Sequence, residues 1–71
     1  MDTSVSNMVR QISDALYKDS RTHKEVIEVG YFQGVVTLTG HVKNAAVFQA
    51  AEEIARSQPG VISVVNELKA G

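Results

Sequence analysis

Two histidines and scattered hydroxyl and carboxyl side chains are the residues of this chain that could do chemistry. His23 and His41 could supply a base or two metal ligands, but neither their spacing nor that of nearby carboxylates matches a metal-binding motif. The serines and aspartates fall at positions typical of helix caps and loops. There is no cysteine, and no glycine-rich loop has phosphate-binding spacing. The sequence therefore predicts no catalytic centre, no metal and no cofactor.

A short polar segment, residues 17–24, holds the one local concentration of positive charge in the sequence. A charge run of this kind usually forms a solvated loop. The alternative is a contact with anionic lipid headgroups, to which each base adds about 1 kcal/mol of attraction. The candidate lipid-binding residues are Lys18, Arg21, Lys24, Lys43 and Tyr17. The aromatic side chains that could insert at a lipid interface are Tyr17, Phe32 and Phe48.

The composition limits the partners that such a chain can have. Its 71 residues form one small domain, with a net charge of -1 that argues against nucleic-acid binding. The first residues carry an acid and no continuous apolar run, which is unlike a signal peptide. No segment approaches the ~20 apolar residues of a transmembrane helix. We therefore expect a soluble, unexported chain, or a domain of a longer exported protein.

The elements that would position these residues are organised around residues 27–42, which have the pattern of a β-hairpin. The expected turn is Gln33-Gly34, because glycine supplies the positive φ that a tight hairpin needs. Phe32 then lies opposite Val35 at the tip. One face of this hairpin is apolar and comprises Ile27, Val29, Tyr31, Val36 and Leu38. The other face comprises Glu28, Gly30, Thr37 and Thr39.

Two amphipathic helices flank the hairpin. Residues 4–18 have an apolar stripe at helical spacing, and so do residues 45–57, with Asn44 placed to cap the second helix. The second stripe is rich in alanine, which lets a helix approach a sheet closely. Phe48 lies at the edge of this stripe, either in the core or in a surface patch. The stripes comprise Val5, Met8, Val9, Ile12, Ala15 and Leu16, and Val47, Ala50, Ala51, Ile54 and Ala55.

Residues 61–68 alternate like a third strand, which would lie beside either arm of the hairpin. Asn66 falls on the face of Val64 and Leu68, so it must be hydrogen-bonded if that face is the core side. The predicted fold is α+β: a two-layer αββαβ sandwich in which two helices pack on one face of a three-stranded mixed sheet. The other sheet face stays uncovered and could receive a partner.

The pattern resembles the BON domain, named after bacterial osmotically inducible and nodulation proteins. The resemblance is carried by the segment GVVTLTGHV, followed by an alanine-rich helix and then by GVISVVNEL. It covers nearly the whole chain, and we expect one domain over residues 4–69 with flexible ends at 1–3 and 70–71. Gln33 stands where the family often has Asp or Asn, and Tyr31 where it has a smaller aliphatic residue.

The resemblance implies a non-catalytic module of a bacterial envelope or stress-related protein. Its glycines, Gly34, Gly40 and Gly60 in this chain, are structural and form no ligand site. The expected function is peripheral association with a phospholipid membrane, and the alternative is protein interaction or self-association through the open sheet face or edge. The expected partner is thus an anionic phospholipid surface or another protein domain. The expected compartment is the periplasm or envelope, with the cytoplasm as the alternative.

Overall fold

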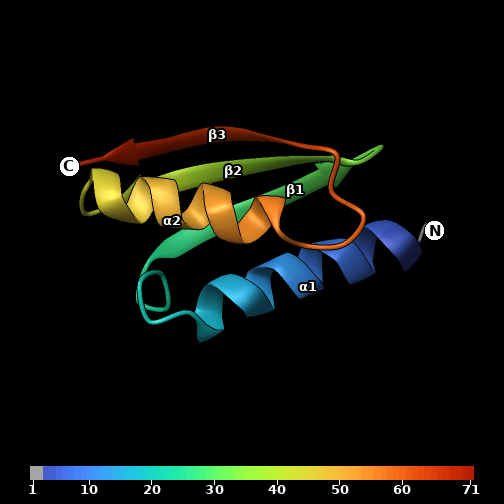
Figure 1. Ribbon diagram of the computed structural model, residues 1–71, viewed down its shortest axis with the longest axis horizontal. Helices are drawn as coiled ribbons and strands as arrows, with labels where there is room; N and C mark the ends of the chain where they lie inside the picture. Colours follow the sequence, from blue (N-terminus) through green and yellow to red (C-terminus); the bar gives the residue numbers. More distant parts are fainter. Residues whose placement is uncertain (1–2) are drawn as a thin grey trace.

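The computed structural model describes residues 3–71, with side chains from residue 7 onward. The elements follow in the order α1 (Thr3–Lys18), β1 (Val26–Phe32), β2 (Val35–Val42), α2 (Ala45–Arg56) and β3 (Ser63–Ala70). The sheet order is β1-β2-β3, with β1 antiparallel and β3 parallel to β2. Both helices lie on the same side of this sheet (Figure 1). The predicted α+β architecture is therefore confirmed.

The hairpin has the predicted register. Phe32 pairs with Val35, Val29 with Leu38 and Ile27 with Gly40. Gln33 and Gly34 both have positive φ, 49° and 85°, as a type I′ turn requires. Asn or Asp would adopt this conformation more easily than Gln33 does. Gln33 is held in it because the apolar pattern of the two strands fixes the register on either side of the turn.

The third strand lies beside β2, which answers the question that the sequence left open. Since β2 and β3 are parallel, α2 forms the crossover between them. β3 starts and ends two residues later than predicted. Its start is delayed because the N–H of Ile62 donates to the Gly34 carbonyl at 2.7 Å, in the link to the turn. Its end is extended because pairing with β2 continues to Val42 and Ala70.

The core lies between the helices and the middle strand. Val36 and Leu38 of β2 are fully buried, as are Ile12 of α1 and Ala51 of α2. Met8, Ala15, Val29 and Tyr31 are partly buried around them, as is Phe48, which therefore belongs to the core rather than to a surface patch. The predictions for the Val5 side chain and for residues 1–2 lie outside the described part of the chain.

The second helix begins and packs as its sequence predicts. The Asn44 side chain accepts a hydrogen bond from the N–H of Val47 at 3.0 Å, which caps the helix. Its buried stripe includes Ala50, Ala51 and Ala55, whose small side chains allow α2 to lie close to β2 and β3.

Asn66 faces the helices and is hydrogen-bonded, as predicted. Its Nδ2 donates to the carbonyl of Phe48 at 3.0 Å, and its Oδ1 accepts from the N–H of Leu68 at 3.1 Å. The side chain thus ties the middle of β3 to α2. This arrangement supplies the partners that a half-buried amide needs.

Candidate functional site

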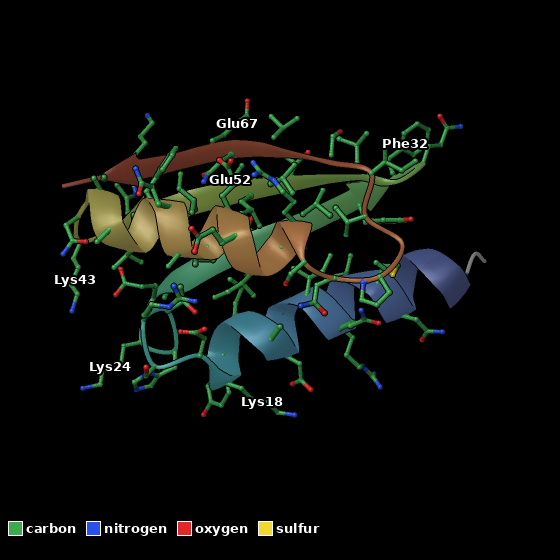
Figure 2. The ribbon with its side chains drawn as sticks, in the orientation of Figure 1. Lys18, Lys24, Phe32, Lys43, Glu52 and Glu67 are labelled. Carbon is green, nitrogen blue, oxygen red and sulfur yellow. The ribbon has the colours of Figure 1, made fainter. Side chains whose placement is uncertain are left out.

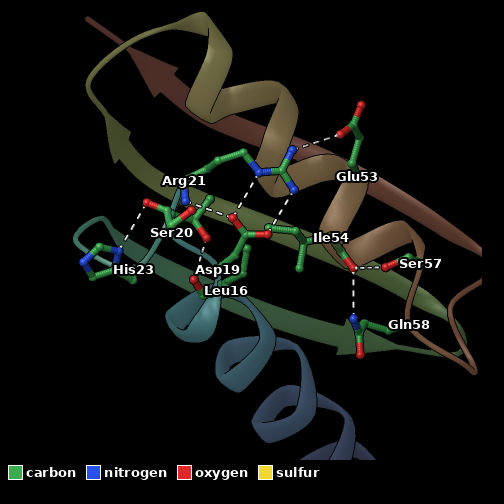
Figure 3. Close-up of polar contacts among 10 residues, drawn as sticks. Leu16, Asp19, Ser20, Arg21, His23, Glu53, Ile54, Ser57 and Gln58 are labelled. Carbon is green, nitrogen blue, oxygen red and sulfur yellow. Dashed lines mark hydrogen bonds and ion pairs between the residues drawn. The ribbon is translucent and has the colours of Figure 1, made fainter.

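The bases predicted to bind lipid differ in how far they are neutralised. Lys18 lies 3.6 Å from Asp14 in an exposed pair one helical turn apart. Arg21 pairs with Asp19 at 3.0 Å and with Glu53 of α2 at 3.5 Å (Figure 3). Lys24 and Lys43 make no ion pair with any described side chain. Of the predicted lipid-binding bases, these last two are therefore the ones with uncompensated charge.

The Asp19–Arg21 pair is built into the local fold of the connector between α1 and β1. One carboxylate oxygen of Asp19 accepts from both the backbone N–H and the Nε of Arg21, at 2.9 and 3.0 Å. The connector is anchored nearby by the buried Thr22, whose hydroxyl donates to the carbonyl of Leu16. The hydrogen bonds from Arg21 lower the pKa of Asp19 to about 2, and the hydrogen bonds to Asp19 raise the pKa of Arg21. Arg21 is thus engaged within the fold.

This pair predicts a specific acid response. The pKa of Asp19 lies below its ordinary value of 3.8, chiefly because the Arg21 side chain donates hydrogen bonds to the carboxylate. A lowered folded-state pKa stabilises the fold above the ordinary value, and this contribution is lost as the pH falls from 3.8 toward 2. An NMR titration of the Asp19 carboxyl should show this pKa, and Arg21→Gln should return it toward 3.8.

Lys24→Gln is the matched control for that titration, because it removes a neighbouring base that does not contact Asp19. It should leave the carboxyl titration unchanged. An ordinary pKa for Asp19 in the unsubstituted chain would contradict the ion pair.

The predicted lipid-binding residues do not all lie together. Tyr17 is 71% exposed and adjoins Lys18 at the end of α1. Figure 2 shows Lys24 and Lys43 toward one end of the molecule, Lys18 nearer the middle on its lower side, and Phe32 at the opposite end. We call Tyr17, Lys18, Lys24 and Lys43 the lysine end. A flat membrane that meets the lysine end leaves Phe32 out of reach, and Phe48 is held in the core, so neither phenylalanine belongs to this site.

A second candidate surface is the sheet face opposite the helices. Phe32 and Val35 form one row across it, and Val65 lies in the next row. Phe32 is 69% exposed and Val65 44% exposed, while Ile62, beside the turn at the same end of the sheet, is 81% exposed. We call Phe32, Val35, Ile62 and Val65 the hairpin-end patch. Phe32, Val35 and Val65 share the open face, Ile62 lies against Gly34 at the turn, and no element among residues 3–71 covers them.

Two carboxylates border this patch. Glu28 of β1 and Glu67 of β3 both pair with Thr39 of β2, so they flank one row of the open face. Both are exposed, and neither forms an ion pair within the described part of the chain. Next to them, a broad depression of about 650 Å³ includes Val26, Glu28 and His41 in its lining. The open face therefore combines an apolar end with these two carboxylates, and the row beyond them holds His41 and Lys69.

Sequence reasoning missed part of this surface. Ile62 and Val65 were not expected to form a site with Phe32, because their proximity depends on β3 lying beside β2. The distance between Phe32 and the bases could have been predicted from the sequence. The connector that carries the bases leads into β1, Phe32 is the last residue of β1, and a seven-residue strand is roughly 20 Å long.

The two histidines lie in different places. The Nδ1 atom of His23, in the connector, lies 3.2 Å from the carbonyl oxygen of Ser20. His41 lines the depression on the open face. Residues 3–71 contain no group of three or more His, Cys, Asp or Glu side chains placed to hold a metal ion. They also contain no helix that is long and apolar enough to span a bilayer.

Comparison with known proteins agrees with the architecture. No curated protein matches the chain. The family model of the BON domain matches residues 4–71, which include both helices and all three strands except for the first residue of α1. This chain therefore belongs to the BON domain family.

Proposed function

We propose that this domain is a non-catalytic protein-binding module whose binding surface is the hairpin-end patch of the open sheet face. Membership of the BON family supports a binding role in an envelope or stress-related protein. The observation that carries the choice of surface is the exposure of Phe32 and Ile62, 69% and 81%, at one end of an uncovered sheet. Contiguous exposed apolar side chains of this kind are typical of interaction sites.

The charges beside the patch indicate the kind of partner. Glu28 and Glu67 are exposed and unpaired within the described side chains, so they repel an anionic lipid surface. If two copies of this chain packed open face to open face with the same rows in contact, the carboxylates of the two copies would repel each other. A partner with apolar side chains and neighbouring bases satisfies both the patch and the acids. The partner is therefore a basic, amphipathic protein surface.

A photo-crosslinking residue at position 32 tests this function in cells of the source organism. We expect discrete protein adducts from position 32 and none from position 49, which is an exposed site on α2, on the opposite side of the molecule. Changing Ile62 to Lys should suppress the adducts without altering the melting temperature, because Ile62 is largely exposed. Equal adducts from both positions, or none from position 32, would refute the proposal.

Lipid association through the lysine end is the second candidate. The observation that favours it is the 71% exposure of Tyr17 beside Lys18, together with Lys24 and Lys43, which have no ion-pair partner among the described side chains. Exposed tyrosines and lysines are common at membrane interfaces. Arg21, a candidate from the sequence, would contribute less because Asp19 and Glu53 already neutralise it.

Co-sedimentation with anionic and neutral vesicles tests this second function. The lysine end predicts a preference for anionic vesicles that is lost when Lys18, Lys24 and Lys43 are changed to Gln, since each base near the surface contributes about 1 kcal/mol. Arg10→Gln, at an exposed position on α1 two turns before Lys18, is the matched control. Equal binding to neutral vesicles would eliminate the electrostatic form of the idea.

A further inference from the structure

The outer edge of β1 carries backbone groups without partners. The two-residue turn makes Phe32 and Val35 a hydrogen-bonded pair, so the N–H and C=O groups that face β2 belong to alternate residues from Phe32 back to Val26. Those of Ile27, Val29 and Tyr31 therefore point away from the sheet. None of them bonds to another described backbone group outside the ladder. β1 also lacks the proline, lysine and bulge that usually protect an edge strand.

The opposite edge is protected near its end. The outward N–H of Leu68 on β3 donates to Asn66 Oδ1 at 3.1 Å. The same side chain is held by the Phe48 carbonyl of α2 at 3.0 Å, so it cannot easily leave the edge. Lys69 adds an exposed charge to β3. The two edges of this sheet thus differ: within residues 3–71 the outward groups of β1 are free from Ile27 to Tyr31, whereas those of β3 are interrupted at Leu68.

A groove lies along the start of this free edge, between α1 and β1. It has a volume of about 220 Å³. Its apolar lining comes from Leu16 and Tyr17 on α1 and from Val26 and Ile27 on β1. A strand added beside β1 would direct alternate side chains to the helix side of the sheet, where this groove can accept one of them. The edge supplies hydrogen bonds, and the groove supplies a site for a side chain.

A second copy of this chain does not fit the edge. α1 packs on β1. Pairing two β1 strands about a two-fold axis would place both α1 helices over neighbouring strands, about 4.8 Å apart, whereas packed helices need about 8 to 10 Å between their axes. An extended peptide carries no such helix. Its residue opposite Glu28 lies on the open face, where a base would pair directly across the strands.

We propose that β1 accepts an extended segment of another protein as an antiparallel fourth strand, with alternating apolar, basic and apolar residues. The two apolar side chains lie opposite Ile27 and Val29, the first of them in the groove against Leu16 and Tyr17. The basic side chain pairs with Glu28 on the open face. This site is separate from the hairpin-end patch, which lies at the other end of β1.

Synthetic capped peptides with Ile-Lys-Ile or Ile-Glu-Ile at their centre test the proposal, with binding followed by NMR titration of the labelled domain. We expect the lysine peptide to bind about fivefold more tightly, from the opposite-charge pair with Glu28. Amide exchange at Ile27 and Val29 should slow on binding, while that at Leu68 should not change. Glu28→Lys should reverse the preference, whereas Glu67→Lys, in the same row on the other edge, should leave it intact.

N-methylation of the peptide separates strand addition from general adhesion. Methyl groups on the two isoleucine nitrogens remove donors that face β1 and should weaken binding about tenfold or more. A methyl group on the lysine nitrogen faces solvent and should have little effect. Failure of both peptides to bind, equal binding of the two methylated forms, or a charge preference that follows Glu67 would overturn the proposal.

Discussion

Replacing Leu38 with alanine is expected to lower the free energy of unfolding by about 2 to 5 kcal/mol. Leu38 is fully buried in the middle strand, between Val29 on β1 and Asn66 on β3. The substitution removes buried apolar surface and leaves a cavity. Since β2 is hydrogen-bonded to a strand on each side, the backbone cannot easily move to fill that cavity. A domain of 71 residues has a total stability of only about 4 to 10 kcal/mol, so the variant should be substantially destabilised or unfolded. Urea denaturation followed by circular dichroism measures this loss.

Val65→Ala is the control for that experiment. Val65 is an apolar strand residue on the neighbouring β3, but it is 44% exposed on the open face. Its loss should cost well under half of the Leu38 effect, because less of its surface leaves water on folding. Similar costs for the two variants would contradict the assignment of the core to the helix side of the sheet.

The hairpin and the helices could be predicted because their information is local. The two arms of the hairpin alternate in phase, and Gly34 permits the positive φ of the turn, so a single register satisfies both. The position of β3 could not be obtained in this way. Residues 61–68 alternate equally well beside β1 or β2, and only the path of α2 across the sheet places the strand. Val61 and Ile62 continue the apolar pattern but belong to the link.

The candidate sites were less predictable because they depend on pairs of distant residues. Arg21 is neutralised partly by Glu53, which is 32 positions away and comes close only when α2 packs beside the connector. The hairpin-end patch likewise needs β3 beside β2 before Val65 can adjoin the row of Phe32 and Val35. The free edge of β1 follows from the sheet order alone. Once that order is known, the two-residue turn determines which residues of β1 bond to β2, and the N–H and C=O groups of the alternate residues are then free.

Replacing Gly40 with alanine is the second substitution expected to have a large effect, about 2 to 4 kcal/mol of lost stability. Gly40 has a φ of +132°, a conformation that residues with a Cβ rarely adopt. A Cβ atom there would also lie 2.6 Å from the carbonyl oxygen of Val26. Val26 pairs with His41, so moving this carbonyl disturbs the start of the β1–β2 ladder. Relief of the contact therefore requires a backbone shift rather than a rotamer change.

Gly30→Ala provides the matched control within the same hairpin. Gly30 has an ordinary φ, and the nearest atom to an added Cβ is Thr37 Cβ at 3.8 Å, which is normal contact. This substitution should be neutral or should stabilise the fold by up to about 1 kcal/mol, because alanine loses less backbone entropy than glycine on folding. Thermal and urea unfolding of both variants measure the difference. If Gly40→Ala is as stable as Gly30→Ala, the close approach of β1 to Gly40 is not required by the fold. In that case the edge of β1 is free to shift at its first residues, and the groove beside Ile27 is not held in a fixed shape for an incoming strand.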